Sequence, residues 1–553
     1  MTRLLLFLAA LVLHHVLNAQ FNWQWARQLT GQIQPSMHGL AVDAAGNTVV
    51  CGGYYGTLTI GALPPLTSAG QSDLFVAKFS ADGTPLWVRG AGGVNFDEAW
   101  DVTVDAQGRI SITGYFESPS ITIGATALSR LGNMDILVAQ YDANGTALWA
   151  QRYGWTASTG LEWGRGIVAD ANNDLYVAGQ YKTALQVTGL PELDACNNRE
   201  QGFLMKLDAN GNGIWSLRPQ CTSDQSLGQT VCNALALDPA GNVFLGGDFR
   251  GDTVFFATDT LPNFMPSGQS DDAFVVKYTP DGEEAWVKAW AGFNYDEIKS
   301  IATDSEGNVI VATTRDGGYL IDGIDLPIAG TLTTYDITLW KVDPQGTAMW
   351  GIRAGNGIGT HELLSADVDA NDHVWAGGYF GRNIFIDTFE VPDLGTDLPY
   401  GLVVAHFDPE GTVLDAYVDR GVGPLLVNRL RCGEAGELHL AGGYNDSITF
   451  APLAQLNGDG SFVVKGDDLT TSITAPPSDH AWSAAPVPAD RYIVITASNG
   501  GALGELRVLD ALGREVLRAS TQGNTFSLDC STWPAGSYLV HSGRLHERIL
   551  VLH

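Results

Sequence analysis

Residues 101–116, DVTVDAQGRISITGYF, and residues 136–153, ILVAQYDANGTALWAQRY, decide the fold of this chain. In each stretch, two runs of apolar or alternating residues flank a short turn that contains Gly, a pattern typical of a β-hairpin. Gly suits such turns because it accepts the positive φ angle that they require. We therefore expect four short strands in this segment and no helix between them.

The same unit recurs along the chain, and this repetition indicates the architecture. An acidic residue opens the first turn of each unit at intervals of 62 to 68 residues: Asp43, Asp105, Asp170, Asp238, Asp304, Asp369 and, in degenerate form, Glu434. A Gly four residues before a Trp marks the second turn: Gly83–Trp87, Gly145–Trp149, Gly211–Trp215, Gly282–Trp286 and Gly346–Trp350, with Asp415 in place of Trp after Gly411. We interpret the Asp residues as turn formers and the Trp residues as core anchors.

Four strands in every repeat, without a helical period, predict an all-β fold, namely a seven-bladed β-propeller over residues 20–466. The two ends of the array favour a closed ring. The stretch QWARQLTG around Trp25 matches the fourth strand of a unit, and residues 461–466, SFVVKG, match a third strand without a fourth. Pairing these two stretches would complete the seventh blade, so we expect the N-terminal strand to close the propeller.

Composition and the N-terminus bound the location of the protein. The chain carries 30 Lys and Arg against 61 Asp and Glu, a formal net charge of −31, which excludes a reader of the nucleic-acid backbone. Arg3, the apolar run of residues 4–13 and Ala19 predict a signal peptide over residues 1–19. No later apolar run is long enough for a transmembrane helix. The six Cys do not define a disulfide pairing by their spacing.

The repeat also resembles a known family. Residues 238–247, DPAGNVFLGG, and residues 272–286, DAFVVKYTPDGEEAW, are similar to the SBBP β-propeller repeat of bacterial exported proteins. The resemblance covers most of residues 20–466 and implies a propeller at or beyond the cell surface. It implies no shared catalytic residues.

A polar linker over residues 467–482 precedes a different module, residues 483–553. Its alternating stretches and spaced turns predict a small C-terminal β-sandwich. Its motif resembles the type IX secretion C-terminal sorting domain at five positions: Pro486, Pro488, Gly513, Gly536 and Tyr538. The resemblance implies export by the type IX machinery of a Bacteroidetes-like cell, and either release or anchoring at the outer surface.

Candidate binding residues lie directly before the innermost strand of several repeats: Asp97, Glu98, Glu162, Asp296, Glu297, His361 and Glu362. At the mouth of a propeller channel they could bind Ca²⁺, attract a cationic partner, or supply the two carboxyls of glycoside chemistry. They could equally accept hydrogen bonds from loop N–H groups. Aromatic residues of the same loops suit stacking on sugar rings: Trp155, Trp163, Phe96 and Tyr295.

No catalytic motif accompanies these residues. The stretch HELLS begins at His361 like a zinc-protease motif, but Ser365 stands where the second His is needed. We therefore predict a secreted or surface-anchored, non-enzymatic module that binds a glycan or a protein. Two alternatives stay open: an extracellular polysaccharide lyase or glycosidase that uses carboxylates at the channel mouth, and a structural spacer in a surface layer. We assign no catalytic residue, no cofactor and no metal ligand, with Ca²⁺ as the one ion left open.

Overall fold

The computed structural model describes residues 22–551 except for the segments 157–159, 195–198, 220–228, 265–269, 292–294, 316–318, 327–335, 356–360, 381–383, 387–388, 392–400, 420–424, 451, 468–482, 486–491, 497–503, 511–514, 522–524, 532, 534–535 and 543–544. The chain divides into two compact units, Met1–Leu469 and Thr470–His553. The expected signal peptide, and the expected linker beyond Asp467, lie outside the described residues. Within the described ranges, no helix has the length and apolar character needed to cross a membrane.

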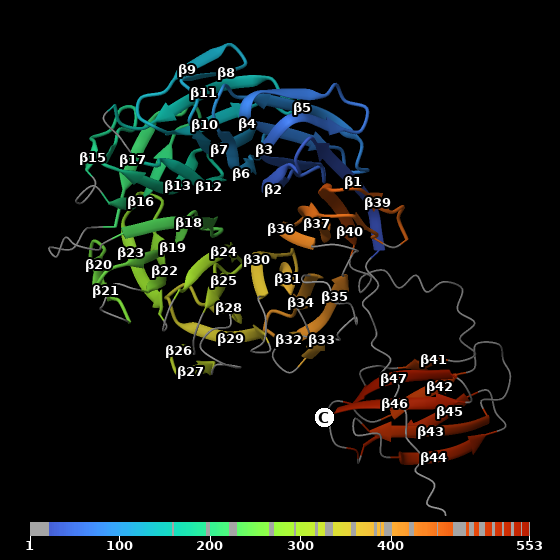
Figure 1. The fold of residues 1–553 in the computed structure, drawn as a ribbon. Coiled ribbons are helices and arrows are strands. Elements are labelled where there is room, and N and C mark those ends of the chain that lie inside the picture. Colours follow the sequence, from blue (N-terminus) through green and yellow to red (C-terminus); the bar gives the residue numbers. More distant parts are fainter. Residues whose placement is uncertain are drawn as a thin grey trace, which may run out of the picture. The chain divides into compact units, whose positions relative to one another are not determined.

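Unit 1 is built from antiparallel sheets with four main strands, which Figure 1 shows side by side around a common centre. One of them, the β24 sheet, has six strands because a short hairpin pairs with its fourth strand. The sheets are named here by their first strand. The β6 sheet has β6 (Asp97–Val104), β7 (Ile110–Phe116), β10 (Asp135–Tyr141) and β11 (Ala147–Tyr153), and the β12 sheet has β12 (Trp163–Ala169), β13 (Leu175–Lys182), β16 (Glu200–Leu207) and β17 (Gly213–Leu217). The β18 sheet has β18 (Gln229–Leu237), β19 (Val243–Arg250), β22 (Asp271–Tyr278) and β23 (Glu284–Trp290), and the main strands of the β24 sheet are β24 (Glu297–Thr303), β25 (Val309–Arg315), β28 (Asp336–Val342) and β29 (Ala348–Gly355). The β30 sheet has β30 (His361–Val368), β31 (Val374–Phe380), β34 (Gly401–Phe407) and β35 (Val413–Asp419).

The two ends of unit 1 share one eight-stranded sheet. Its strands are β36 (Leu425–Cys432), β37 (Glu437–Tyr444), β40 (Gly460–Asp467) and β1 (Asn22–Gly31), followed by β2 (Ser36–Val42), β3 (Thr48–Ile60), β4 (Leu66–Phe79) and β5 (Pro85–Ala91). The N-terminal strand β1 pairs antiparallel with β40 from Asn22↔Asp467 to Leu29↔Ser461. These are the two stretches that lacked partners in the sequence repeat.

The strand that precedes the first turn of each repeat contacts the corresponding strands of the two neighbouring repeats. These contacts run from β2 to β6, β12, β18, β24, β30 and β36, and β36 in turn contacts β2. In Figure 1 these strands lie nearest the centre. We call them the innermost strands.

Short hairpins extend from the main sheets. They are β8 (Ser120–Ile123) with β9 (Thr126–Ser129), β14 (Ala184–Leu185) with β15 (Leu193–Asp194), β20 (Thr253–Phe255) with β21 (Thr260–Pro262), β26 (Tyr319–Ile321) with β27 (Ile324–Leu326), β32 (Ile384–Ile386) with β33 (Phe389–Val391), and β38 (Ser447–Ile448) with β39 (Leu456–Asn457).

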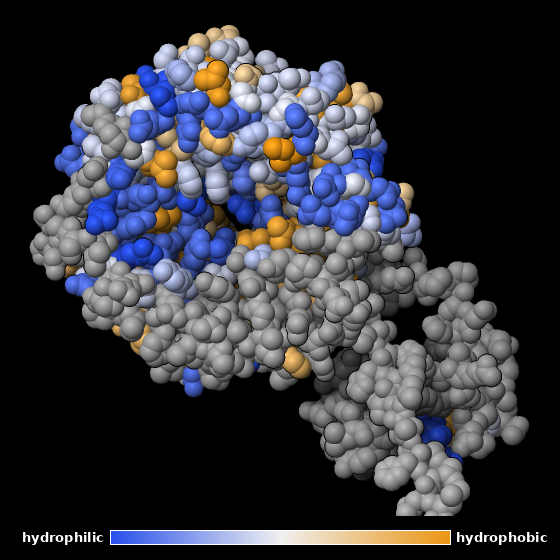
Figure 2. All heavy atoms as spheres, viewed as in Figure 1, coloured by the Kyte–Doolittle hydropathy of each residue, from blue (hydrophilic) through white to orange (hydrophobic). Residues whose placement is uncertain are grey.

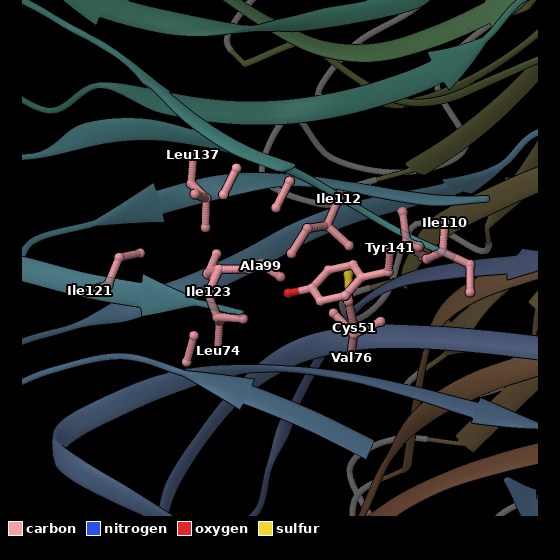
Figure 3. Packing of buried hydrophobic residues seen from close by; sticks show 14 of the residues in the cluster. Cys51, Leu74, Val76, Ala99, Ile110, Ile112, Ile121, Ile123, Leu137 and Tyr141 are labelled. Atoms are coloured by element: carbon pink, nitrogen blue, oxygen red, sulfur yellow. The ribbon is translucent and has the colours of Figure 1, made fainter. Parts of the chain in front are cut away.

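The core of unit 1 lies between neighbouring sheets. Every residue of β7 and of β10 is buried, because sheets cover both faces of these strands. Figure 3 shows one such cluster, in which Ile110 and Ile112 of β7 pack with Leu74 and Val76 of β4. Burying one such side chain contributes about 1.5–3 kcal/mol, so the packing between sheets stabilises the unit.

The repeated Trp residues also link consecutive sheets by hydrogen bonds. Each indole N–H donates to a backbone carbonyl in a turn of the next repeat. Trp25 donates to Ala81 within the eight-stranded sheet, and the others donate to the next sheet: Trp87 to Ala143, Trp149 to Ala209, Trp215 to Pro280, Trp286 to Pro344 and Trp350 to Pro409. The Gly of that turn lies against the same ring, as Gly145 does against Trp87. The Gly–Trp marker of the sequence is therefore a contact between sheets as well as a core anchor.

The last repeated turn corrects one detail of the sequence interpretation. In the other repeats, the acidic residue that opens the first turn donates its backbone N–H to the carbonyl four residues later, as Asp43 does to Asn47. Next to β36 it is Gly433 that makes this bond, to Glu437. The assignment of Glu434 as the seventh marker is therefore wrong by one residue, because Gly433 has no carboxylate by which the pattern could be recognised.

The described thiols of unit 1 are not bridged: Cys51 and Cys232 are buried and Cys432 is half-buried. Cys51, Cys232 and Cys432 are free, while Cys196 and Cys221 lie outside the described residues. Burial raises the pKa of Cys51 and of Cys232, so neither is a nucleophile at neutral pH.

Unit 2 contains two antiparallel sheets. One has β41 (Ser483–Ala485), β42 (Tyr492–Thr496) and β45 (Thr525–Asp529); the other has β44 (Glu515–Thr521), β43 (Gly504–Asp510), β46 (Gly536–Ser542) and β47 (Leu545–Val551). Of the expected sorting-motif residues, Gly536 and Tyr538 lie on β46. Pro486, Pro488 and Gly513 lie outside the described residues.

Candidate functional site

Each innermost strand carries a β-bulge at the same place. The register against the second strand shifts at Met37/Gly39, Ala99/Asp101, Gly164/Gly166, Cys232/Ala234, Ile298/Ser300, Leu363/Ser365 and Val427/Arg429. A bulge inserts one extra residue and re-aims side chains, and bulges are common beside functional sites. The inserted residues, which we call the bulge row, are His38, Trp100, Arg165, Asn233, Lys299, Leu364 and Asn428.

Strand alternation sorts the candidate residues of the sequence analysis into two groups. Glu98, Trp163, Glu297 and Glu362 occupy one register position, two residues before the bulge row. Asp97, Glu162, Asp296 and His361 come one residue earlier, and successive side chains of a strand point to opposite faces. The side chains of His361 and Glu362 are outside the described set.

Asp97 supports a loop. Its carboxylate is fully buried and accepts hydrogen bonds from the N–H groups of Gly93 at 2.7 Å, Glu117 at 3.1 Å and Ser118 at 3.0 Å. The Ser118 hydroxyl also donates to it at 2.6 Å. Burial raises the pKa of Asp97 despite these bonds. Glu162 and Asp296 are fully buried too, so none of the three presents its carboxylate to solvent.

Glu98 and Glu297 each contact a residue of the bulge row. Glu98 Oε2 lies 3.3 Å from His38 Nε2, and the Ser72 hydroxyl donates to Glu98 at 2.9 Å. Burial acts to raise the pKa of Glu98, but the contacts with His38 and Ser72 bring it below its ordinary value. Glu297 is 42% exposed and pairs with Lys299 at 2.7 Å.

Four rings stack across three sheets beside these carboxylates. His38 stacks on Trp100 with centroids 4.5 Å apart, Trp100 on Trp163 at 5.4 Å, and Trp163 on Tyr115 at 5.6 Å. The Arg165 guanidinium lies over both indoles, 5.3 Å from Trp100 and 4.6 Å from Trp163. Cation–π contacts of this kind hold an Arg in a fixed orientation.

The other aromatic candidates lie outside this stack. Trp155 is half-buried in the loop after β11. Phe96 meets Tyr55 edge-on at 6.1 Å. Tyr295 is 48% exposed, with Arg250 over its ring at 5.8 Å.

The charged residues that line a cavity among the innermost strands are four cations and one carboxylate: Arg165, Lys299, Arg429, Arg431 and Asp101. The whole chain has twice as many acidic as basic residues, 61 against 30. The lining therefore reverses the charge balance of the chain and favours an anionic group. Figure 2 shows unit 1 hollowed near its centre, with hydrophilic residues around much of the hollow.

Asp248 stands next to this cavity with an unusual protonation state. Burial, with repulsion from Glu297 and Asp271, raises its pKa to about 8, although Arg165 opposes the shift. Asn233 of the bulge row donates its amide N–H to Asp248 at 2.8 Å. At neutral pH the Asp248 carboxyl is therefore largely protonated and can donate a hydrogen bond.

The sequence analysis missed most residues of this site: Trp100, Arg165, Asp248, Lys299, Arg429 and Arg431. One signal was available, since Trp100, Arg165 and Lys299 recur at equal spacing from the turn Asp of their repeats. What the spacing does not reveal is the bulge, which decides the face on which they lie.

Three comparisons bear on identity. A model of the secretion system C-terminal sorting domain matches residues 483–548. An uncharacterised WD repeat-containing protein of Acanthamoeba polyphaga mimivirus is 23% identical over an alignment of 425 residues. The alignment covers 65% of this chain and 30% of that protein, so the chain spans less than a third of this relative.

Among solved structures, a catalytically inactive virginiamycin B lyase from Staphylococcus aureus with quinupristin overlaps 80% of this chain and 98% of its own, with 8% identity and a TM-score of 0.35. A puromycin hydrolase variant overlaps 84% of this chain and 59% of its own, with 14% identity and a TM-score of 0.41.

The chain is thus a β-propeller-like protein that ends in a type IX secretion C-terminal sorting domain. That domain directs the protein through the type IX machinery to the outside of the cell or to its outer surface.

Proposed function

We propose that this protein is an extracellular binding module whose ligand is a polysaccharide bearing carboxylate or sulfate groups. Residues 1–19 would be removed as a signal peptide, residues 20–466 would form a closed seven-bladed propeller of SBBP type, and residues 483–553 would serve for sorting. The ligand would bind at the channel mouth, where Glu98, Trp163 and the bulge row meet.

The reversed charge of the channel cavity carries this proposal. Four cationic side chains converge where the rest of the chain is strongly acidic. An Arg guanidinium matches the planar oxygens of a carboxylate or sulfate and can donate two parallel hydrogen bonds. A cavity of low dielectric strengthens that attraction compared with an exposed surface.

The strand contacts support a closed ring. β1 pairs with β40 over most of its length, and β36 contacts β2 as the other innermost strands contact one another. A closed ring would leave no free sheet edge and would hold the bulge row in a fixed circle. Such rigidity lowers the entropic cost of binding.

Calorimetric titration of the secreted chain tests the proposal. The ligands are polygalacturonate, a sulfated glycan and neutral dextran at two salt concentrations. We expect binding of the acidic polymers alone, weakened by salt. Arg165→Gln and Lys299→Gln should each weaken it at least tenfold. Lys288→Gln is the matched control, because Lys288 lies on the fourth strand β23, outside the cavity lining, and pairs with Asp322 of the neighbouring hairpin.

Equal affinity for dextran, or an unchanged affinity of the Arg165 variant, would overturn the proposal. A flat response to every polymer would favour a protein ligand or a structural spacer.

A polysaccharide lyase or glycosidase is the second candidate, and Asp248 is the observation in its favour. A carboxyl with a pKa of about 8 beside Glu297 is suited to proton transfer near neutral pH. Release of unsaturated uronate or of reducing ends, abolished by Asp248→Asn, would establish an enzyme. Binding of the intact polymer without any product would leave the binding module.

A further inference from the structure

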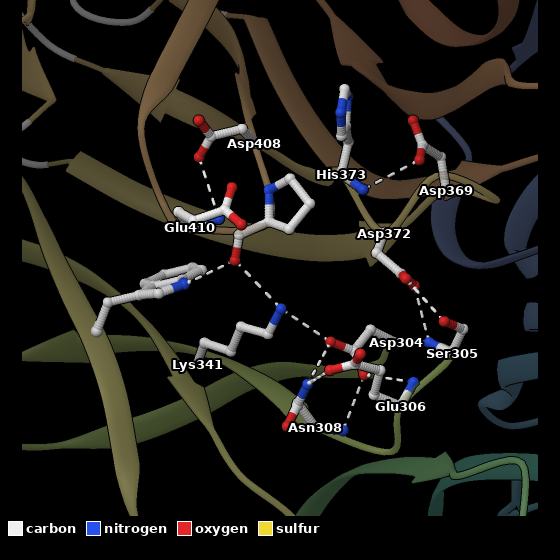
Figure 4. Close-up of polar contacts among 12 residues, drawn as sticks. Asp304, Ser305, Glu306, Asn308, Lys341, Asp369, Asp372, His373, Asp408 and Glu410 are labelled. Carbon is white, nitrogen blue, oxygen red and sulfur yellow. Dashed lines mark hydrogen bonds and ion pairs between the residues drawn. The ribbon is translucent and has the colours of Figure 1, made fainter. Parts of the chain in front are cut away.

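A buried polar network repeats in four sheets of unit 1. The turn Asp pairs with a Lys of the third strand: Asp43 with Lys78 at 2.8 Å, Asp170 with Lys206 at 3.1 Å, Asp238 with Lys277 at 3.2 Å and Asp304 with Lys341 at 2.8 Å. In three of these sheets an Asn four residues after the Asp donates to the same carboxylate, as Asn308 does to Asp304. Figure 4 shows the network of Asp304, Asn308 and Lys341. In each case an ammonium ion balances the charge of the buried carboxylate.

The β30 sheet changes this network at three positions together. His373 replaces the Asn, and His406 replaces the Lys. Opposite His406 on the fourth strand lies Asp415, where Trp350 lies opposite Lys341 in the preceding sheet. Only the turn residue, Asp369, is kept. A single loss would suggest drift, but these three changes put two imidazoles and an extra carboxylate into one place.

The three side chains already converge. His373 Nδ1 lies 2.9 Å from His406 Nε2, and ligand atoms of Asp369, His373 and His406 all lie within 4.8 Å of one another. Asp369 and His373 are half-buried and His406 is buried, so the group is reachable from one side. Asp369 and His373 are seen together beside the neighbouring turns in Figure 4.

We propose that Asp369, His373 and His406 bind a divalent transition-metal ion, with Zn²⁺ as the best match, in the place that a Lys ammonium occupies in four other sheets. Zinc takes imidazole nitrogen and carboxylate oxygen at about 2.0–2.2 Å in a tetrahedral arrangement. The two imidazole nitrogens need to separate only slightly to admit the ion. Three protein ligands leave the fourth position to water or to a ligand group.

Neighbouring side chains form the second layer that metal-binding histidines generally have. His406 Nδ1 lies 3.7 Å from Asp415 Oδ1, which orients Nε2 toward His373. The ring of Trp375 stacks on His406 at 3.7 Å with an angle of 8° between planes. Its indole N–H donates to Asp369 at 3.2 Å, so Trp375 holds two of the three ligands.

The experiment measures metal bound to the full secreted chain. Protein stripped with chelator is dialysed against Zn²⁺ alone and its metal content is determined; Co²⁺ then reports the coordination by its visible absorption. We expect one Zn²⁺ per chain, a dissociation constant of micromolar or below, and the strong bands of tetrahedral Co²⁺. Zn²⁺ should also raise the melting temperature.

The decisive variant is His373→Asn with His406→Lys, because it rebuilds the Asp–Asn–Lys network of the β24 sheet and should fold. It should bind no Zn²⁺ and should melt at the same temperature with and without the ion. His38→Asn, which alters a histidine of the channel, should keep the full stoichiometry. Failure of the native chain to bind Zn²⁺ at 100-micromolar concentration, or full binding by the double variant, would overturn the proposal. Neither result depends on the polysaccharide site.

Discussion

Gly145→Ala tests whether the Gly–Trp contacts between sheets stabilise the repeat array. Gly145 has a φ of 78°, and a Cβ added there would lie 2.7 Å from Trp87 Cδ2 and 2.9 Å from Cε2. Real Cβ atoms do not approach so closely, so either the turn or the indole must move. The displacement also strains the hydrogen bond from Trp87 Nε1 to Ala143, which is 3.1 Å long.

The same sheet provides a matched control in Gly108. It has a φ of 75° and closes a turn of the same kind, but its added Cβ would meet only Ala143 Cβ at an ordinary 3.8 Å. An Ala in the left-handed backbone conformation destabilises the folded state by about 1–2 kcal/mol. Replacing Gly also lowers the entropy of the unfolded chain, which offsets about 0.4–1 kcal/mol of that loss. Gly108→Ala should therefore cost about 1 kcal/mol. Gly145→Ala adds an overpacking cost of about 1–3 kcal/mol.

Equilibrium urea unfolding of both variants, followed by Trp fluorescence, measures the difference. We expect Gly145→Ala to lose at least about 1 kcal/mol more than Gly108→Ala. In a Trp87→Leu background the extra loss should largely disappear, because the ring that causes it is absent. Equal losses for the two single variants would refute the role given to the Trp ring.

Three further predictions concern buried charges of unit 1. Lys341→Met leaves the Asp304 carboxylate, which is 1% exposed, without its cation. Urea unfolding should show a loss of about 3–5 kcal/mol in the free energy of unfolding. The double variant Lys341→Met with Asp304→Asn should lose less, because no unpaired charge stays buried. The neighbouring His439, at 3.8 Å, and Lys465, which donates a hydrogen bond at 3.2 Å, lower the pKa of Glu437 to about 2. The stability that Glu437 contributes is therefore complete above its ordinary pKa of 4.5 and is lost as the pH falls toward 2, so Glu437→Gln should flatten acid unfolding over that window. Burial raises the pKa of Asp248 to about 8. The contribution of protonated Asp248 to the stability of the fold is therefore complete below the ordinary Asp pKa of 3.8 and is lost as the pH rises toward 8. Affinity for an acidic polysaccharide should fall near pH 8, as Asp248 becomes charged, and an unaltered fall in Asp248→Asn would contradict this.

The repeat itself could be predicted because each marker has a local cause. Gly145 is required by the φ of its turn, and Asp105 forms a turn by accepting from the N–H groups of Gln107 and Arg109. Such residues act within a few positions of themselves, so their spacing is visible in the sequence. The partnership of β1 with β40 was predictable for a related reason, because Trp25 and residues 461–466 keep the pattern of strands that have lost their partners.

The site could be predicted only in part because its side chains are sorted by a register shift. Asp97 and Glu98 are adjacent in sequence, yet one is buried against a loop and the other pairs with His38 of the bulge row. Alternation predicts that they face opposite ways but not which of them faces the channel. The bulge at Trp100 adds one residue to the strand and so determines which residues of the following segment turn inward.

Repetition also separates structural residues from functional ones. A residue that recurs at its position in several sheets, such as Lys78 or Lys341, meets a need that the sheets share, here the neutralisation of a buried Asp. A position that changes from sheet to sheet has no such shared need. The bulge row is of this kind, since it holds His, Trp, Arg, Asn, Lys and Leu at one structural place. His406 is a different case, because it replaces the Lys of a network that four other sheets keep, and His373 and Asp415 change together with it. Paired departures of this sort are where a second chemistry has replaced the first, and they point to the β30 sheet as firmly as the reversed charge points to the channel.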